Sequence, residues 1–266
     1  GLNGSTLQSG SAAQLLSGST AARFSGSAAQ LLSGTTAYTL GADAQVERVN
    51  VLDATYNAAV KGNEFNQVLD ASRVTSAGVT LNGGGGTDTL IGSSGNDLFV
   101  VDDASDVIID TKGGPNSISF AGTGGYDLAA GVNVTSLSVD ASVKTGVYLV
   151  GNEFSQTITG GVGNDVLNGG AGNDTLNGGD GFDQLFGNDG DDVLNGGMGD
   201  DSLEGGAGTN ALDGGEDFDS VVEEGDQDYK LAEDALVTSA GTQNLASIEY
   251  AVLTAGSGNN NIDASG

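Results

Sequence analysis

Apolar and polar positions repeat in nonapeptide units from Gly160 to Val222. Each unit opens with glycine, has an acid or amide at its sixth place and an aliphatic residue at its eighth. The units are GGVGNDVLN, GGAGNDTLN, GGDGFDQLF, GNDGDDVLN, GGMGDDSLE, GGAGTNALD and GGEDFDSVV. A fixed period predicts a stacked architecture, in which the glycines form turns and the aliphatic residue lies in a short inward-facing strand. These aliphatic residues are Leu167, Leu176, Leu185, Leu194, Leu203, Leu212 and Val221.

A shorter repeat occupies residues 11–34, which read SAAQLLSG, STAARFSG and SAAQLLSG. The segment AAQLL alone also suits an amphipathic helix. Because Ser-Gly recurs in every octapeptide and would break such a helix, we favour short strands of a solenoid.

A third, longer repeat links the blocks. Tyr38–Leu40 matches Tyr126–Leu128, and GNEFNQVL at 62–69 matches GNEFSQTI at 151–158. A partial copy begins near Tyr229. We expect the pattern to continue in a further roll beyond residue 266.

The composition is acidic and rich in glycine. There are 47 glycines, one proline, no cysteine and no histidine, and the formal net charge is −29. Such a chain raises the alternative of disorder, but the strict placement of its apolar residues predicts folding once the charge is neutralised. The acidity argues against nucleic acid or an anionic membrane as partner. No apolar run approaches the roughly 18 residues of a membrane span.

The nonapeptides resemble the RTX (repeats-in-toxin) family, which binds calcium in a parallel β-roll. The resemblance implies an all-β, right-handed parallel β-roll or β-solenoid with two nonapeptides per coil, so that each unit stacks on the unit two places later. It also implies several Ca²⁺ ions between stacked turns. Calcium prefers six to eight oxygen ligands, whereas zinc would need the histidine or cysteine that this sequence lacks.

The resemblance assigns ligands by position. The sixth-place carboxylates are Asp88, Asp97, Asp106, Asp165, Asp174, Asp183, Asp192, Asp201 and Asp219. The backbone carbonyl ligands are those of Gly84, Gly86, Gly161, Gly163, Gly170, Gly172, Gly179, Gly181, Asn188, Gly190, Gly197, Gly199, Gly206 and Gly208. The alternative for the acids is a solvated face, but a scattered acidic surface would not recur at multiples of nine.

Some units depart from the pattern. Amides stand at the sixth place in four of them: Gln67, Asn116, Gln156 and Asn210. We expect the first three to mark coils without a full site, and the fourth to weaken one site of the main roll. The turn before Asp106 has no glycine, which counts against its site. Asn188 and Asp217 also replace glycines, and Asp217 needs a turn that glycine forms easily.

These patterns predict four regions. Residues 1–36 form octapeptide coils without calcium, and 37–119 a first linking unit with a short roll. Residues 120–228 form a second linking unit with the main roll at 160–222, and 229–266 a partial third unit.

The sequence offers no catalytic constellation. Without histidine there is no Ser-His-Asp triad and no HExxH site, so we expect no enzyme. The leading hypothesis is a calcium-binding structural segment of a secreted surface or matrix protein: an adhesin, filament or surface layer. The alternative is an accessory folding module of an RTX protease, lipase or epimerase. Proteins of this type use type I export, which implies an extracellular address. Unpaired edges at solenoid ends make end-to-end self-association, or contact with other surface components, conceivable.

Metal and folding are expected to be coupled. Residues 160–222 contain twelve Asp and two Glu and neither Lys nor Arg, which gives a charge of −14. Closing this segment into a roll concentrates mutual repulsion. We therefore expect it to be largely unfolded without Ca²⁺ and to fold cooperatively with it.

Overall fold

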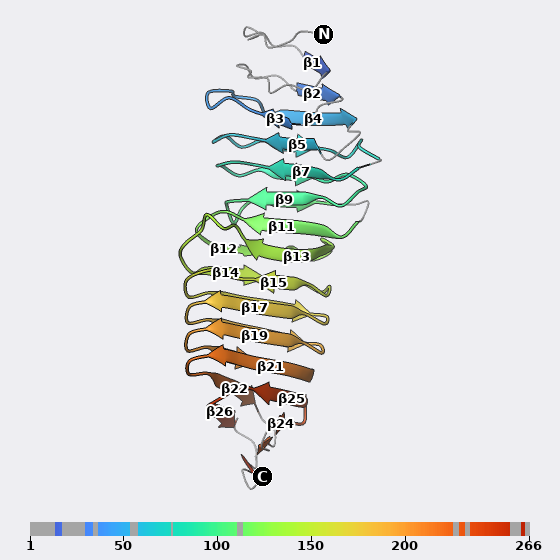
Figure 1. The fold of residues 1–266 in the computed structure, drawn as a ribbon. Helices are drawn as coiled ribbons and strands as arrows, with labels where there is room; N and C mark the ends of the chain where they lie inside the picture. Colours follow the sequence, from blue (N-terminus) through green and yellow to red (C-terminus); the bar gives the residue numbers. More distant parts are fainter. Residues whose placement is uncertain are drawn as a thin grey trace. The chain divides into compact units, whose positions relative to one another are not determined.

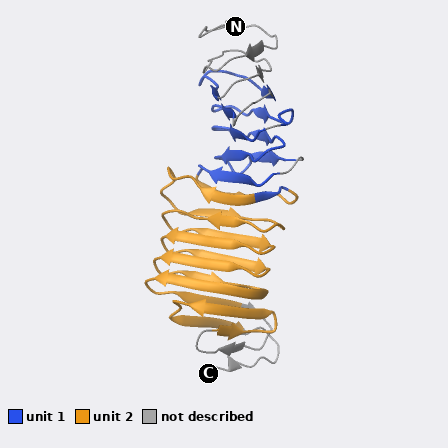
Figure 2. Ribbon diagram, turned by 45° about the vertical axis from the view of Figure 1, so that its right-hand side comes forward, with its two compact units in different colours: residues 1–122, 132–134 blue, residues 123–131, 135–266 orange. Residues whose placement is uncertain are grey.

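A computed structural model describes residues 14–17, 30–33, 37–53, 58–75, 77–110, 114–225, 229–231, 235–255 and 262–263. It divides into two compact units, residues 1–122 with 132–134 and residues 123–131 with 135–266 (Figure 2). Within the described ranges all regular structure is β-strand, so no helix there could cross a membrane. The predicted all-β class is confirmed.

Unit 1 is a β-solenoid with two parallel faces. One face consists, in order, of β1 (Gln14–Ser17), β2 (Gln30–Ser33), β4 (Arg48–Asp53), β6 (Val68–Asp70), β8 (Thr89–Ile91) and β10 (Val107–Ile109). The other consists of β3 (Ala37–Thr39), β5 (Ala58–Lys61), β7 (Val79–Asn82), β9 (Leu98–Val101) and β11 (Asn116–Phe120). β1 and β2 pair with Gln14 opposite Gln30, so these segments are strands and not helices. The rest of the predicted octapeptide region lies outside the described residues.

Unit 2 has the same construction (Figure 1). One face consists of β12 (Gly124–Asp127), β14 (Val147–Val150), β16 (Val166–Ala171), β18 (Gln184–Asp189), β20 (Ser202–Glu204), β22 (Ser220–Gly225) and β26 (Tyr250–Ala255). The other consists of β13 (Val134–Val139), β15 (Thr157–Thr159), β17 (Thr175–Asp180), β19 (Val193–Met198), β21 (Gly208–Glu216), β25 (Gly241–Ala246), β24 (Ala235–Val237), β23 (Tyr229–Leu231) and β27 (Ile262–Asp263).

The predicted register is confirmed in the main roll. Leu167 lies opposite Leu185, and Leu176 opposite Leu194, so each nonapeptide stacks on the one two places later. In a strand, alternate residues face one side. The sixth, eighth and next first places therefore point inward together, and the eighth-place residues from Leu167 to Val221 are at most 1% exposed. These aliphatic rows form the core of the roll.

Coil length varies outside the nonapeptides. Val68 pairs with Thr89, and Ser220 pairs with Tyr250, so both of these coils are longer than two nonapeptides. β24 also pairs antiparallel with β25. The sequence predicted only parallel stacking there. The antiparallel strand arises because the longer connection after β22 supplies residues that fold back before β25 rejoins the stack.

Candidate metal sites

The sixth-place residues form columns inside unit 2. In the first column, the backbone N–H of Asp165, Asp183 and Asp201 each donates to Oδ1 of the aspartate one coil later, at 2.7, 2.8 and 2.8 Å. In the second column, the N–H of Asp174 donates to Asp192 Oδ1 at 2.8 Å. The structure thus brings together the residues that the repeat spacing predicted. One carboxylate oxygen of each later residue ties two coils together.

The other carboxylate oxygen remains unsatisfied at most of these positions. The aspartates are at most 2% exposed. Among the described residues, Oδ2 is buried without a hydrogen-bond partner in Asp88, Asp174, Asp183, Asp192, Asp201 and Asp219. An ionised oxygen without a partner is costly to bury, so a cation or a proton at each of these atoms would stabilise the fold.

The glycines at the first place of each unit have no side chain, and they therefore leave room beside these oxygens. A Cβ atom at Gly178 would come within 3.0 Å of both Asp183 Oδ2 and the carbonyl oxygen of Gly196. A Cβ atom at Gly196 would meet Asp201 Oδ2 and the carbonyl oxygen of Gly214 in the same way. A carboxylate oxygen and a backbone carbonyl from the next coil therefore converge at each glycine.

Burial and like charge disfavour the ionised state of these acids. Burial raises the pKa of Asp183 to about 7, and the charges of Asp201 and Asp165 add to the effect. Burial likewise raises the pKa of Asp174 and of Asp201 to about 6, with contributions from Asp192 and Asp219 respectively. A bound divalent cation would reverse this trend, because an opposite charge favours the carboxylate.

The donor set fits calcium. In the part of the chain that the structure describes, no three His, Cys, Asp or Glu side chains come together as a metal-binding group. The ligands that the columns offer are carboxylate oxygens and backbone carbonyl oxygens, which are the hard oxygen donors that Ca²⁺ takes. The second-place carbonyls of Gly161 and Asn188 accept ladder hydrogen bonds from Asp180 N at 3.0 Å and Ala207 N at 2.7 Å, and each retains a second lone pair.

Other predicted carbonyl ligands also lie close to the next coil. A Cβ atom at Gly181 would meet the oxygen of Gly163, and one at Gly179 would meet that of Gly161. The second- and fourth-place carbonyls therefore point toward the next coil, and their role as ligands stays a prediction.

Unit 1 has fewer favourable positions. The N–H of Asp88 donates to Asp106 Oδ1 at 2.8 Å, and burial raises the pKa of Asp88 to about 7, with Asp106 adding to the effect. Asp106 Oδ2 accepts the N–H groups of Asp102 and Asp103 at 3.2 and 3.4 Å. The glycine-free turn thus satisfies this oxygen through its own backbone, whereas the corresponding oxygen of Asp88 has no hydrogen-bond partner among the described residues.

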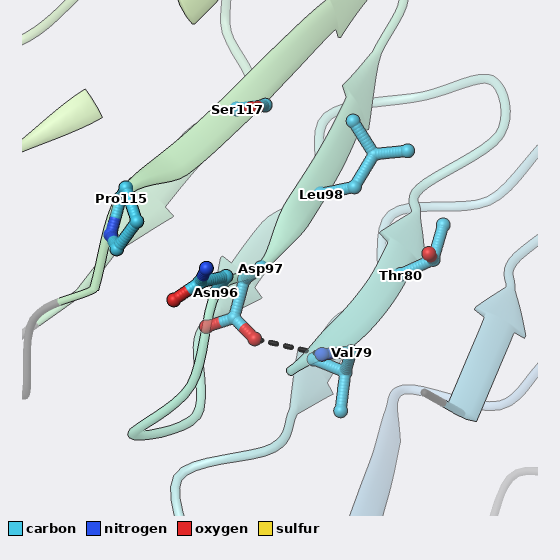
Figure 3. Close-up of a pocket in the computed structure, with 7 residues that line it drawn as sticks. All are labelled: Val79, Thr80, Asn96, Asp97, Leu98, Pro115 and Ser117. Atoms are coloured by element: carbon cyan, nitrogen blue, oxygen red, sulfur yellow. Dashed lines mark hydrogen bonds between the residues drawn. The ribbon is translucent and has the colours of Figure 1, made fainter. Parts of the chain in front are cut away.

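Asp97 is satisfied within the protein. Its Oδ1 accepts Val79 N at 2.8 Å and Ser93 Oγ at 2.7 Å, and its Oδ2 accepts Ser93 N at 2.7 Å. Figure 3 shows Asp97 beside a surface pocket of about 400 Å³ lined also by Leu98 and Pro115. Because Ser93 already supplies donors to both oxygens, Asp97 is a poorer candidate ligand than Asp88.

Amide side chains occupy the sixth place in the turns that open each roll. Gln156 Oε1 accepts Asn152 N at 3.1 Å, and Gln156 Nε2 donates to Asn152 Oδ1 at 2.8 Å. Gln67 and Asn63 make the same pair of bonds at 3.2 and 2.7 Å. Here the amide N–H groups satisfy the polar atoms. That these coils lack a full metal site stays a prediction.

Two predicted irregularities keep the glycine conformation. Asn188 has φ +73° and Asp217 has φ +82°, within the left-handed region that glycine favours. Asn and Asp enter this region more readily than other side chains, so the turns keep their shape.

The sequence reasoning missed a second ladder at the fifth place. Asn164, Asn173 and Asp200 accept, through Oδ1, the N–H of the fifth-place residue one coil later. These bonds measure 3.1 Å, and Asp191 makes the same contact with Thr209 at 2.8 Å. The sequence signal for this ladder was the frequent Asn or Asp at the fifth place, directly before the sixth-place acid. The fifth-place side chains reach forward and the sixth-place side chains reach backward, so both tie the coils without metal.

A pair of adjacent glycines offers a test of the site geometry. A Cβ atom at Gly160 would meet Gly178 O and Asp165 Oδ2 closer than 3.0 Å, whereas one at Gly161 would have its nearest neighbour, a Val139 carbon, at 3.5 Å. In saturating calcium, we expect Gly160→Ala to cost about 1–3 kcal/mol of unfolding free energy, and Gly161→Ala to be neutral or slightly stabilising. Denaturant unfolding measures both. Equal losses would show that space at the first place is not limiting.

Comparison with known families supports the metal assignment. The model of the RTX calcium-binding nonapeptide repeat matches the chain in four copies, over residues 79–109, 150–185 and 186–221. A search of curated proteins gave no match. The matched residues contain the aspartate columns and the glycine turns described above. Over these residues the chain is therefore similar to the RTX calcium-binding nonapeptide repeat, and the coils that they form stack as a parallel β-roll.

Proposed function

We propose that this chain is a calcium-stiffened structural segment, without catalytic activity of its own, of a secreted cell-surface or extracellular-matrix protein such as an adhesin, a filament or a surface layer. The observation that carries the proposal is the set of buried aspartate columns, in which most Oδ2 atoms have no hydrogen-bond partner among the described residues. The interior of the same coils is filled by stacked aliphatic side chains.

Calcium concentration would decide where the segment folds. Extracellular calcium modules bind with Kd of roughly 10⁻⁴–10⁻³ M. With that affinity the repeats stay unfolded at cytosolic calcium and fold after export, which suits passage through a type I channel. Stiffening then occurs at the cell surface, where the segment works.

A calcium titration followed by far-UV circular dichroism tests the proposal. We expect a cooperative gain of β-structure with a midpoint of roughly 10⁻⁴–10⁻³ M. Single-molecule pulling of the calcium-loaded chain is expected to require higher force than pulling in chelator. A midpoint near or below about 10⁻⁶ M, as for cytosolic sensors, would contradict folding after export.

The sequence of the parent protein on either side of this segment distinguishes a surface or matrix protein from an accessory module of an enzyme. Further repeats on both sides of this segment would support a surface or matrix protein. A catalytic domain joined to it would instead identify an accessory folding module.

Magnesium serves as the control ion in the calcium titration, because it demands smaller octahedral sites and keeps its waters.

A further inference from the structure

The first aspartate column continues beyond the nonapeptides. β22 and β26 pair in parallel with Ser220 opposite Tyr250, so Asp219 and Glu249 face each other just before the paired strands. The N–H of Asp219 donates to Glu249 Oε2 at 2.7 Å. The N–H of Asp201 makes the equivalent bond to Asp219 Oδ1 at 2.8 Å. Glu249 therefore takes the next position in the column, although the connection to it is longer than a regular coil.

The gap between Asp219 and Glu249 contains an unsatisfied oxygen. Asp219 is 0% exposed, and its Oδ2 has no hydrogen-bond partner among the described residues. A Cβ atom at Gly214 would meet both this oxygen and the carbonyl oxygen of Ser247. One coil earlier, Gly196 has the same relation to Asp201 Oδ2 and Gly214 O. Ser247 thus supplies the carbonyl that a first-place glycine supplies within the repeats.

The opposite column ends in a different way. Asn210 and Gln243 are each 0% exposed, and they face each other in paired strands. Asn210 Nδ2 donates to Gln243 Oε1 at 2.8 Å, and Gln243 Nε2 donates to Gly206 O at 2.9 Å. The amide N–H groups satisfy the oxygens of this gap, so it needs no cation. No such donor reaches Asp219 Oδ2 from the residues that the structure describes.

From this contrast we infer that Asp219, Ser247 and Glu249 form a further calcium site, in which a glutamate from outside the nonapeptides closes the column that begins at Asp165. The inference rests on calcium binding by the repeats. Asp219 is surrounded by negative charge, since Glu249, Asp200 and Asp217 all act on it. Glu249 is exposed, so this site is more open to water than the internal gaps and is expected to bind more weakly.

Counting bound ions in the whole chain tests the site. Isothermal titration with calcium chloride is expected to give one fewer ion per chain for Glu249→Gln than for the unaltered protein, with the same circular dichroism in saturating calcium. The control is Glu216→Gln, which removes the same charge from an exposed side chain in the nonapeptide that contains Asp219. It is expected to keep the full number of ions.

The outcomes separate the two claims. An unaltered chain that binds no calcium would refute calcium binding by the repeats. An unaltered chain that binds calcium, and a Glu249→Gln variant that binds equally many ions, would overturn only the site at Glu249. Equal loss in Glu216→Gln would also overturn it, because the effect would then follow charge and not position.

A terbium measurement keeps the inference testable if Glu249→Gln does not fold. Terbium also takes hard oxygen ligands, and a tyrosine close to it sensitises its emission. Tyr250 is adjacent to Glu249 and lies with its ring centroid 6.3 Å from that of Phe218. Tyr250→Phe keeps an aromatic ring there, and we expect it to lose part of the sensitised emission. Unchanged emission would mean that no ion lies beside Glu249.

Discussion

Removal of calcium at pH 7 is expected to abolish most of the β-structure of residues 160–222. The segment carries a charge of −14, and its sixth-place carboxylates are buried in columns. A cation bound between two coils would neutralise a facing pair of carboxylates and tie the coils together. A site contributes about 2.7 kcal/mol at calcium 100-fold above its Kd, so the loss of several sites is comparable to the whole stability of a typical domain, about 5–15 kcal/mol.

Far-UV circular dichroism before and after addition of chelator measures this effect. Restoring calcium should restore the spectrum, and sodium chloride at equal ionic strength should not, because screening leaves the buried pairs largely unaffected. A spectrum that chelator leaves unchanged would show that the fifth- and sixth-place hydrogen bonds hold the roll without metal.

Low pH is expected to stabilise the fold in part when calcium is absent, because protons then neutralise the buried aspartates. In the calcium-free roll, burial raises the pKa of Asp183 from 3.8 to about 7 and that of Asp174 to about 6. The folded state thus binds protons more tightly than the unfolded chain does, so stability falls as pH rises through this window. The stabilisation is complete below about pH 4 and is lost as pH approaches 7. In calcium-free buffer, β-structure should therefore increase as pH is lowered from 7 to about 4.

Calcium reverses the sign of the pH effect. Ions and protons compete for the same oxygens, so calcium affinity should decrease as pH falls over this range. Asp183→Asn imitates the protonated residue. The variant should gain structure at pH 7 without calcium, and with calcium it should bind more weakly the ions of the two gaps that residue 183 borders. Circular dichroism against pH, with and without calcium, measures both effects. A calcium-free spectrum that loses β-structure on acidification would contradict the argument.

The columns could be predicted because the repeat is strict. One nonapeptide advances the chain by half a coil, so Asp165 and Asp183 had to face each other once the strands stacked in parallel. The positions without a carboxylate could also be found in the sequence, since Gln156 and Asn210 present amides where neighbouring units present carboxylates. The roles of single oxygens were not readable, because Oδ1 and Oδ2 differ only in which neighbouring backbone groups they face.

Prediction was poorer where the coil length changed. Glu249 belongs to no nonapeptide, and the connection from Asp219 departs from the regular spacing. The hydrogen bond from Ser93 to Asp97 was also not predicted. A serine at the second place, where most units have glycine, does not by itself indicate which group its hydroxyl will contact.

The sequence by itself determined the parallel stacking, the inward aliphatic rows and the facing aspartates, because a fixed period maps each residue onto the same place in every coil. The tertiary structure alone decided which carboxylate oxygens lack a partner, and that Gln243 closes one column with an amide while Glu249 closes the other with a carboxylate. These features depend on contacts between residues far apart in the chain, across connections of irregular length, and no local pattern encodes such contacts.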